Sequence, residues 1–454
     1  MTTSPSSIPI ADLRGSLNGS VITPDDAGYD DARTVYFKGI NRRPAAVARP
    51  VDAAGVAAVV NFARESGAEL AVRSGGHSRA GFGTSEGGIV LDLSDMRAVE
   101  VDAENRTALA QTGAKAVEYT TATGTHGLAT GLGDAPTVGI GGITLGGGVG
   151  FLVRKNGLTI DDLLGAEVVT ADGKLLEVDE DNHPDLYWAI RGGGGNFGVA
   201  TRFRFRLHEI DHVVGGMMML PATPAVIAGL VQAGEAAPEE LSIIANVMAA
   251  APPMPMIPAE QRGKPVVMVL LVFAGPEEEA ESALAPLRAL DPIADMLKPM
   301  RYPEIYAGEG EGPTIVHAAS NNILTDGIDS DAAAAILDGL GRGTAAMNVC
   351  QIRVLGGAMA RVPADTTAFG HRDAKIMANV AAAYEDPAET DEHQAWVDQM
   401  SSELRNGGRA YVGFLGDEGL ERAYPPSTLK RLAEVKRQYD PDNLFRLNLN
   451  IPPA

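Results

Sequence analysis

A run of closely spaced glycines constrains this chain more than any other feature. Residues 131–150, GLGDAPTVGIGGITLGGGVG, contain nine glycines in twenty residues. Apolar residues interrupt the glycines, and a flexible linker does not need such a lining. Glycines packed in this way let backbone N–H groups approach a flat or anionic ligand closely. The run therefore predicts a cofactor cradle.

A strand, a helix and a second strand are predicted ahead of that run. Residues 46–50 are extended, Asp52 is a suitable helix cap, and apolar residues at helical spacing follow it until Gly67. Residues 69–72 form a second short apolar segment, which leads into the loop RSGGHS. A loop delivered in this way is typical of a binding site.

The loop RSGGHS contains a cation, bare backbone and an imidazole. Arg73 together with Gly75 and Gly76 suits the binding of a diphosphate, while His77 meets the ring of the cofactor. An isolated loop histidine is more often without a special role. The neighbours of His77 favour a functional interpretation of this histidine.

Charge and composition exclude several classes of partner. The 454 residues include 37 basic and 59 acidic side chains, which gives a net charge of −22. Such a surface repels phosphate backbones and anionic membranes, so we expect neither nucleic acid nor membrane as a partner. The longest apolar run, residues 266–274, is too short to span a bilayer, and the N-terminus does not resemble a secretory signal. A cytoplasmic location is expected.

Cys350 is the single cysteine of the chain. It can form neither an intramolecular disulfide nor a site built from several cysteines. Stability must therefore come from packing.

A change of pattern near residue 212 predicts a domain boundary. Asp172-Gly173 predicts a hairpin, and residues 199–207 alternate as a half-buried strand does. Residues 213–410 then mix strand-like runs with helical patterns, which is typical of a sheet with helices on one face. A last helix, capped by Ser427 or Thr428, is expected to stop at Asp440-Pro441.

Two motifs suggest other chemistries. GGGNFG, residues 193–198, matches G-x-G-x-x-G, but a strand pattern follows it where a nucleotide-binding fold requires a helix. HEIDH, residues 208–212, matches the zinc motif H-E-x-x-H, which works only on a helix. Its setting between a strand and a turn favours a polar interdomain turn, and a zinc hydrolase remains a remote alternative.

Four motifs in order resemble those of the berberine bridge enzyme-like flavin oxidases. They are RSGGHS, GDAPTVGIGG with LGGGVG, GGGGNFGV, and the closing YDPDNLFRLNLNIPP, and the resemblance extends from about residue 40 to the end. This family belongs to the vanillyl-alcohol oxidase superfamily, whose FAD-binding domain is of the p-cresol methylhydroxylase type. The resemblance implies a two-domain α+β flavoprotein. Residues 1–211 would bind FAD, residues 212–415 would form a substrate domain with an antiparallel sheet covered by helices, and residues 416–454 would return to the FAD-binding domain.

The resemblance also implies how the flavin is held. In the family, the histidine of RSGGHS bonds covalently to a methyl group of the flavin, and it corresponds to His77. Many members form a second bond through a cysteine before P-T-V-G, but Ala135 stands there, so a single attachment is expected, as in the hydroxynicotine oxidase branch. The residues expected to contact FAD are Arg73, Ser74, Gly75, Gly76, His77, Ser78, Pro136, Thr137, Val138, Gly139, Gly141, Gly142, Gly146, Gly148, Gly150, Gly198, Val199, Asn448 and Asn450.

The implied activity is an FAD-dependent oxidation of a small molecule. Hydride passes from a carbon bearing a hydroxyl or amine to FAD, and dioxygen is reduced to hydrogen peroxide. Val138 corresponds to a gate for dioxygen and resembles the oxygen-reactive members. A dehydrogenase that uses another acceptor shares every motif, so that alternative stays open. An alcohol, a sugar and an alkaloid-like amine remain possible substrates, and the oligomeric state is open.

Tyr411 is the candidate catalytic base. It corresponds to a family tyrosine, but a phenol with a pKa of about 10 needs a nearby cation or the field of the flavin to act near neutral pH. A simply packed tyrosine is an equal alternative, and an amine substrate could lose its proton to solvent. The amides of Asn448 or Asn450 would stabilise charge on the reduced flavin. Ile143 replaces a frequent family histidine, so we expect a less polar pocket than usual.

Overall fold

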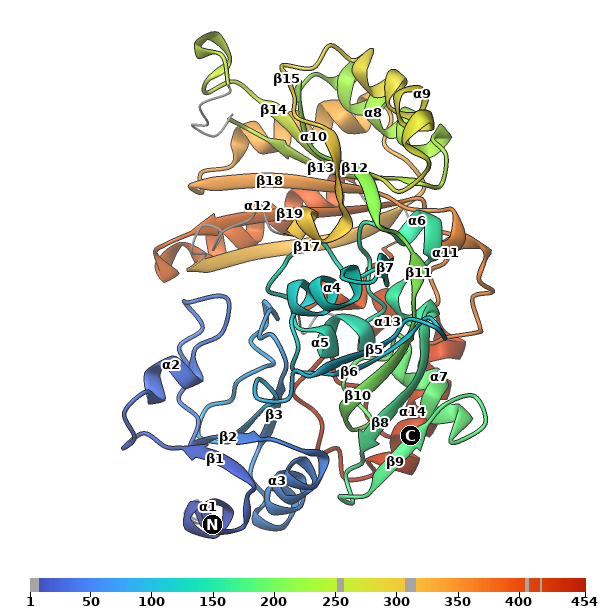
Figure 1. Cartoon of the computed structure of the whole chain (residues 1–454). Coiled ribbons are helices and arrows are strands. Elements are labelled where there is room, and N and C mark those ends of the chain that lie inside the picture. The colour runs from blue at the N-terminus through green and yellow to red at the C-terminus, as the bar shows by residue number, and fades with distance from the viewer. Residues whose placement is uncertain (1–7, 251–256, 307–315, 405–407, 417–418) are drawn as a thin grey trace.

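Three main sheets organise the chain in the computed structural model, which describes residues 8–250, 257–306, 316–404, 408–416 and 419–454. Two smaller sheets occupy the lower half of Figure 1, and an eight-stranded sheet crosses the upper half. No helix in these described ranges is long and apolar enough to cross a membrane.

The first sheet carries the histidine loop. Its order is β1-β2-β4-β3, with β2 and β3 parallel to β4 and β1 antiparallel to β2. The Asp52 side chain caps the helix between β2 and β3 by accepting a hydrogen bond from the Gly55 N–H at 2.7 Å, and Gly67 ends that helix at φ +68°. The predicted strand, helix and strand are confirmed. The elements are α1 (Ile10–Ser16), β1 (Gly19–Ile22), α2 (Tyr29–Arg33), β2 (Ala46–Pro50), α3 (Ala53–Ser66), β3 (Leu70–Arg73) and β4 (Ile89–Asp92).

The second sheet has the order β5-β6-β10-β8-β9 and is antiparallel throughout. Asp172-Gly173 joins β8 to β9, which confirms the predicted hairpin. The glycine run lies between β6 and β8 and contains one short helix, α5. The elements are β5 (Val99–Asp102), β6 (Thr107–Gln111), α4 (Ala116–Gly124), β7 (Leu128–Ala129), α5 (Ile140–Leu145), α6 (Val153–Asn156), η1 (Thr159–Asp161), β8 (Leu163–Val169), β9 (Leu175–Val178), α7 (Pro184–Ile190) and β10 (Val199–Arg206).

The third sheet is entirely antiparallel. Its order is β15-β12-β14-β13-β18-β19-β17, and β16 also pairs with β12. β11 (His208–Glu209) precedes this sheet in the chain and pairs with β7. The strands of the third sheet are β12 (His212–Pro221), β13 (Leu241–Met248), β14 (Val266–Phe273), β15 (Ala294–Asp295), β16 (Lys298–Arg301), β17 (His317–Thr325), β18 (Met347–Val354) and β19 (Ile376–Tyr384).

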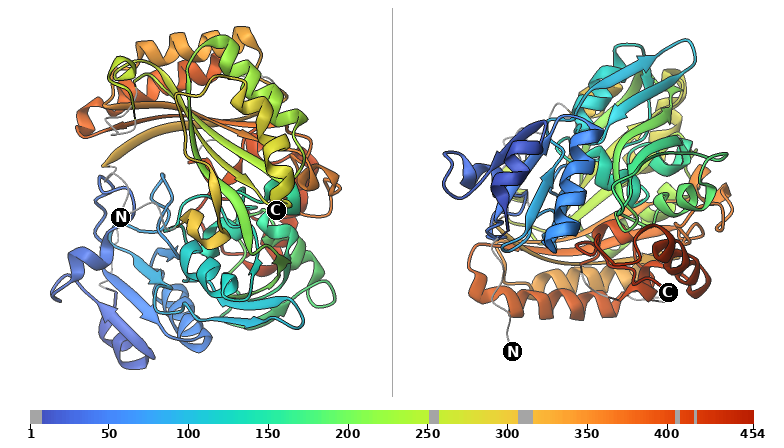
Figure 2. Two further views of the ribbon diagram at one scale, coloured as in Figure 1. Left: turned by 45° about the horizontal axis from the view of Figure 1, so that its top comes forward. Right: turned by 90° about the horizontal axis from the view of Figure 1, so that it is seen from below.

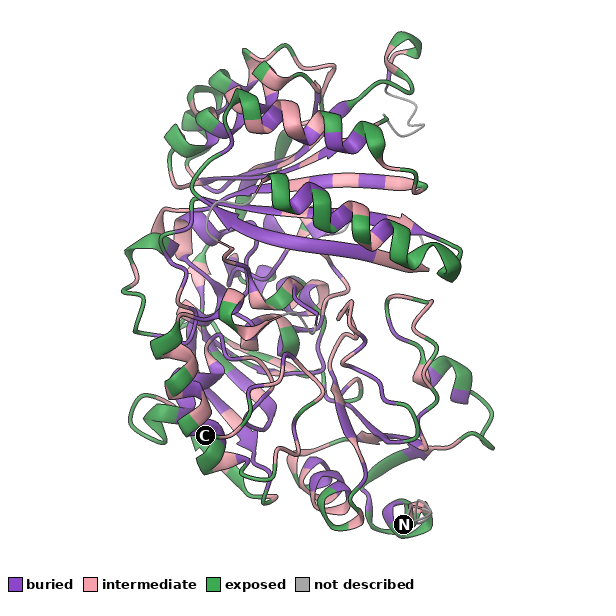
Figure 3. Ribbon diagram, turned by 180° about the vertical axis from the view of Figure 1, so that it is seen from behind, coloured by how far each residue is buried: buried purple, intermediate pink, exposed green. Residues whose placement is uncertain are grey.

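Helices cover the outer face of this sheet, away from the smaller sheets (Figure 2). Ala333, Ile336 and Leu340 lie on one face of α10 and are buried against the sheet. Burial of each large aliphatic side chain stabilises the fold by about 1.5–3 kcal/mol. Figure 3 shows the buried strands and the exposed outer sides of the helices, as predicted for a covered antiparallel sheet. The remaining elements of this half are α8 (Pro224–Ala236), η2 (Ala259–Gln261), α9 (Glu277–Arg288), η3 (Tyr302–Tyr306), α10 (Ser330–Arg342), α11 (Ala358–Arg361), η4 (Pro387–Glu389) and α12 (Thr390–Glu403).

The C-terminal segment packs back on the smaller sheets. It contains α13 (Leu420–Ala423) and α14 (Pro426–Tyr439), and η5 (Val412–Phe414) lies just before it. Leu432 and Ile451 belong to the same buried cluster as residues of the second sheet. The prediction that Ser427 or Thr428 caps α14 is wrong, because the helix starts earlier, at Pro426, where proline is favoured in the first turn.

Candidate functional site

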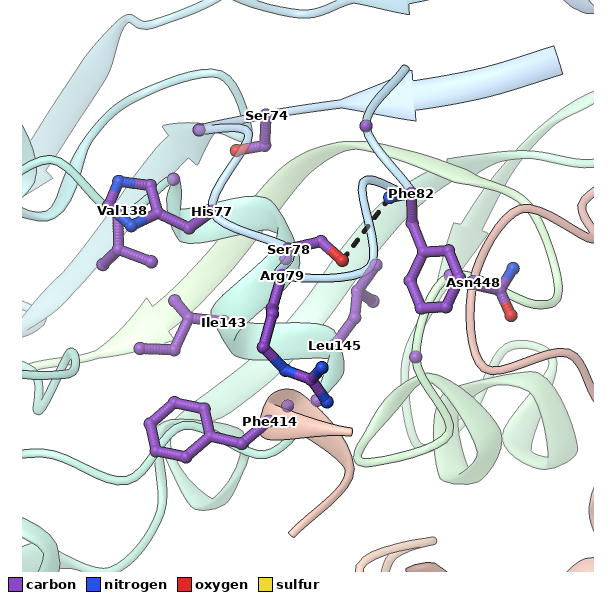
Figure 4. A pocket seen from close by; sticks show the side chains of 18 of the residues that line it. Ser74, His77, Ser78, Arg79, Phe82, Val138, Ile143, Leu145, Phe414 and Asn448 are labelled. Atoms are coloured by element: carbon purple, nitrogen blue, oxygen red, sulfur yellow. Dashed lines mark hydrogen bonds between the residues drawn. The ribbon is translucent and has the colours of Figure 1, made fainter. Parts of the chain in front are cut away.

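A cavity of about 530 Å³ lies where the smaller sheets meet the inner face of the third sheet. Its walls come from the histidine loop, the glycine run, the segment before β10, the strands β17 to β19 and the C-terminal segment. Figure 4 shows ten labelled side chains of this lining. A cavity of this size that is mostly apolar with a few polar groups is typical of a small-molecule or cofactor site.

Most of the residues selected from the sequence line this cavity. The structure places Pro136, Thr137, Gly148, Gly150 and Asn450 outside the lining. The predicted residues that line it are Arg73, Ser74, Gly75, Gly76, His77, Ser78, Val138, Gly139, Gly141, Gly142, Gly146, Gly198, Val199, Tyr411 and Asn448.

Bare backbone forms one wall of the cavity. A Cβ atom on Gly139 would lie 2.1 Å from Ser74 Oγ and 2.2 Å from Gly75 N, so the two glycine loops touch backbone to backbone. A Cβ atom on Gly142 would meet no atom within 4 Å, so backbone faces open space there. This cradle fits a flat group that needs close access to backbone N–H groups.

Asn448 offers the cavity a hydrogen-bond acceptor. Its Nδ2 donates to the Phe445 carbonyl at 2.9 Å, whereas its Oδ1 is buried without a partner among the described residues. A buried polar atom without a partner is costly unless a ligand satisfies it. The residues present therefore fit a flavin on this wall.

Arg73 lines the cavity, but its guanidinium is already paired inside the protein. Its guanidinium donates to Asp92 Oδ2 at 2.9 Å and to the backbone carbonyls of Ala32 and Thr34. The side chain is only 6% exposed. The cation that was expected to meet a diphosphate is thus paired inside the first sheet, where it fixes the start of the histidine loop.

His77 is held by two neighbours. Its Nε2 lies 3.0 Å from Thr137 Oγ1, and its ring stacks on Tyr36 with ring centroids 4.1 Å apart and planes 23° apart. Burial lowers the pKa of His77 to about 4, against a smaller opposing effect of a hydrogen bond to the backbone of Thr137. The imidazole is therefore neutral at neutral pH and keeps a nitrogen lone pair.

Tyr411 lies at the cavity with its hydroxyl buried. The oxygen accepts a hydrogen bond from the Gly148 N–H at 3.1 Å, and the Tyr411 N–H donates to Asn322 Oδ1 at 2.6 Å. Burial raises the pKa of Tyr411, while the Gly148 hydrogen bond and the Arg353 charge oppose that rise. The phenol is therefore protonated at neutral pH, which suits a hydrogen-bond donor better than a base.

The inner face of the third sheet supplies polar residues that the sequence did not reveal. Strand register aligns four carboxamides in one row across β13, β18, β19 and β17. They are Asn246, Gln351, Asn379 and Asn322. Asn379 lines the cavity, and its Oδ1 is buried without a partner among the described residues. No sequence signal marks this row, because only the pairing of distant strands creates it.

Arg353 connects this face to the glycine run. It donates to Asp134 Oδ2 at 2.8 Å and to Gln351 Oε1 at 2.7 Å, and it lies over the Phe414 ring with 5.3 Å from Cζ to the centroid. The ion pair is shielded from water because the Arg353 side chain is 5% exposed. Arg353 therefore fixes the third sheet against the cradle.

The HEIDH segment does not form the helix that a zinc site requires. It spans β11 and the start of β12. His208 Nε2 lies 2.7 Å from Asp162 Oδ1, and His212 Nδ1 lies 3.1 Å from Asp211 Oδ2. Throughout the described ranges, no group of three or more His, Cys, Asp or Glu side chains is arranged to hold a metal ion.

Comparisons with known proteins agree with this geometry. Residues 44–179 match the model of the FAD binding domain family, and residues 410–452 match the family described as berberine and berberine like. The chain is 31% identical to (R)-6-hydroxynicotine oxidase of Paenarthrobacter nicotinovorans, over 96% of this chain and 97% of the relative. It belongs to the berberine bridge enzyme-like family of FAD-linked oxidoreductases.

Solved structures of similar proteins have the same fold. The crystal structure of 6-hydroxy-D-nicotine oxidase from Arthrobacter nicotinovorans superposes with a TM-score of 0.86 at 29% identity, over 97% of this chain and 99% of that one. Xylooligosaccharide oxidase from Myceliophthora thermophila has a TM-score of 0.85 at 24% identity, over 99% and 100% of the two chains, and supports the fold alone. The two-domain α+β fold is thereby confirmed, and the chain is an FAD-linked oxidoreductase.

Alanine occupies the position before the P-T-V-G stretch, so no thiol stands there for a second attachment. Ala135 lines the cavity. Cys350 is fully buried on the helix-covered side of the third sheet, and burial raises the pKa of its thiol to about 12. Its thiol is therefore neither ionised nor able to reach the cavity.

Proposed function

We propose that this protein is an FAD-dependent oxidase whose flavin is attached once, through His77. The observation that carries the proposal is the position of His77, a neutral imidazole at the cavity wall beside the loop that contains Val138. Ala135 and the buried Cys350 support a single attachment, because neither supplies a thiol to the cavity. We also propose that residues 1–211 and 416–454 hold FAD and that residues 212–415 hold the substrate, since the cavity takes its walls from both parts.

The proposed substrate is a small alcohol or amine with a largely apolar skeleton. FAD supplies the hydride acceptor when it is bound. Phe82, Ile143 and Phe414 offer apolar contact (Figure 4). Asn379 and Tyr411 also line the cavity and offer polar atoms that would orient a substrate. An oligosaccharide would leave most of its hydroxyl groups without partners on such a lining. The full-length similarity to a hydroxynicotine oxidase supports an amine on an apolar ring system.

The residues of this chain orient the substrate and exclude water. The protonated Tyr411 donates its hydroxyl hydrogen to the substrate heteroatom, and the Gly148 N–H fixes the phenol oxygen. A neutral amine can transfer hydride without a protein base, which agrees with the raised pKa of Tyr411.

Formation of hydrogen peroxide tests whether the protein is an oxidase. The purified protein should be offered cyclic secondary amines, aromatic secondary alcohols and oligosaccharides, with peroxide followed by a peroxidase-coupled assay. We expect that the protein oxidises an amine or an alcohol and forms one molecule of hydrogen peroxide for each substrate molecule oxidised. Turnover only with an artificial electron acceptor would instead establish a dehydrogenase.

The Tyr411→Phe variant distinguishes a donor from a base. Loss of one hydrogen bond should lower kcat/KM by about tenfold, which corresponds to about 1.4 kcal/mol, with FAD content unchanged. Loss of a general base would cost about 10²–10⁴-fold and remove a limb of the pH profile. Steady-state kinetics between pH 6 and pH 9 measure both.

The Val138→Leu variant tests access of dioxygen. Val138 lines the cavity in the loop beside His77, and a larger side chain there should obstruct the approach of dioxygen. We expect reoxidation by dioxygen to slow by about tenfold, or about 1.4 kcal/mol in the barrier, while turnover with an artificial acceptor is unchanged. Val138→Ala is the control, and stopped-flow reoxidation is the measurement. Equal rates in all three proteins would exclude Val138 as a gate.

A further inference from the structure

The hydrogen bond between His77 and Thr137 determines which imidazole nitrogen is available. Thr137 Oγ1 lies 3.0 Å from His77 Nε2. A neutral imidazole carries one N–H and one lone pair, and the partner of one nitrogen fixes the role of the other. If Thr137 accepts from Nε2–H, the lone pair lies on Nδ1.

Several neighbours hold the ring of His77 in place. Thr137 contacts the ring through its hydroxyl, and a hydrogen bond to its backbone also favours the protonated ring. The charge of Lys115 lowers the pKa of the ring, and the charge of Asp134 raises it. Tyr36 stacks on the ring and limits its rotation.

The backbone holds Thr137 firmly against the histidine loop. The Ala116 N–H donates to the Val138 carbonyl at 2.9 Å, and Gly139 forms an isolated β-bridge with Lys115. Gly139 also touches Gly75, two residues before His77. The hydroxyl of Thr137 and the imidazole therefore belong to one rigid contact between the two loops.

We propose that Thr137 is a positioning residue for covalent attachment of the flavin, because it holds Nε2–H and leaves the Nδ1 lone pair to form the bond. This inference rests on the proposed attachment at His77. Nδ1 bonds to the carbon of a flavin methyl group, one methyl C–H bond breaks, and the ring loses its Nε2 proton afterwards. The two electrons left on the flavin pass to dioxygen, which takes up the two hydrogens as hydrogen peroxide.

Thr137 also stabilises the charge that develops in this step. The imidazole becomes positively charged as Nδ1 forms its fourth bond, so the hydrogen bond from Nε2–H to Thr137 becomes charge-assisted and stronger. A residue that strengthens its contact as the reaction proceeds lowers the barrier.

The test compares Thr137→Val, which removes the hydroxyl at nearly constant volume, with Thr137→Ser, which keeps it. Flavin-free full-length protein is mixed with FAD, and bound flavin and acid-stable flavin are measured over time. We expect Thr137→Val to bind FAD at the wild-type stoichiometry but to attach it about tenfold more slowly, and Thr137→Ser to attach it at nearly the wild-type rate. Attachment by Thr137→Val at the wild-type rate would overturn the role of Thr137.

A second measurement needs no variant of Thr137. Nitrogen-15 NMR of histidine-labelled, flavin-free wild-type protein at neutral pH reports the tautomer, with the His77 signals assigned by their loss in His77→Ala. We expect the proton on Nε2, and a proton on Nδ1 would contradict the inference. If wild-type protein forms no acid-stable flavin at all, the proposed attachment at His77 fails, which is distinct from failure of Thr137 alone.

Discussion

Replacement of His77 by alanine is expected to abolish covalent attachment of flavin. Acid precipitation of the wild-type protein should leave the yellow colour in the pellet, whereas the His77→Ala protein should release all of its flavin to the supernatant. The reason is that His77 supplies the neutral nitrogen at the cavity wall, since burial lowers its pKa to about 4.

The remaining lining should still bind FAD without a bond in His77→Ala. The imidazole is not needed to form the backbone cradle at Gly139 and Gly142 or to place the side-chain oxygen Oδ1 of Asn448. His126, an exposed histidine outside the lining, provides the matched control, and His126→Ala should behave as the wild type does. Flavin that stays with the His77→Ala pellet would show that another residue forms the bond.

The Asp440→Asn substitution is expected to lower the free energy of unfolding more than any other substitution proposed for this protein. Lys436 Nζ and Asp440 Oδ2 lie 2.6 Å apart, and both side chains are fully buried. Lys436 also donates to the Asn196 and Phe445 carbonyls, while the Asp440 carboxylate accepts from the Leu444 and Phe445 N–H groups. Removing one charge leaves the other buried without its partner, which costs about 3–5 kcal/mol.

That loss is a large fraction of the roughly 5–15 kcal/mol by which a protein domain is usually stable. Urea unfolding of Asp440→Asn and wild-type protein measures the difference. The control is Asp185→Asn, which breaks the exposed ion pair with Arg431, 2.9 Å long, and should cost less than about 1 kcal/mol. Equal losses in the two variants would show that the buried pair is not what stabilises the C-terminal segment.

The same substitution should weaken FAD binding. Asp440 fixes the backbone at Leu444 and Phe445, and the segment from Phe445 to Leu449 contributes to the cavity wall. The YDPDN motif is thereby explained in physical terms, since its aspartate Asp440 neutralises a buried lysine and orders the residues that follow.

Local sequence signals predicted the parts of the fold that short-range chemistry determines. Asp52 and Gly67 mark the ends of α3 because a side-chain cap and a left-handed residue act within one helical turn. Asp172-Gly173 marked a hairpin for a similar reason. The presence of Ser427 and Thr428 did not predict the start of α14 correctly, because the helix begins before them, with proline at its first position.

Long-range contacts account for what the sequence did not reveal. Arg73 was expected to offer its charge to a ligand, but the parallel pairing of β3 with β4 brings Asp92 beside it. Asn246, Gln351 and Asn379 share a row only because three distant strands pair in that register. Motif order revealed the family, since each motif is continuous in the chain, whereas the substrate-facing wall is assembled from separate strands.

Peptide mapping of the purified wild-type protein tests the central claim most directly. Trypsin cleaves after Arg73 and Arg79, so digestion of the denatured protein isolates the peptide SGGHSR, which contains His77 and no other histidine. We predict that this peptide carries one flavin and that fragmentation places it on the imidazole. An unmodified SGGHSR peptide, with all flavin free in solution or on another peptide, would contradict the attachment proposed here.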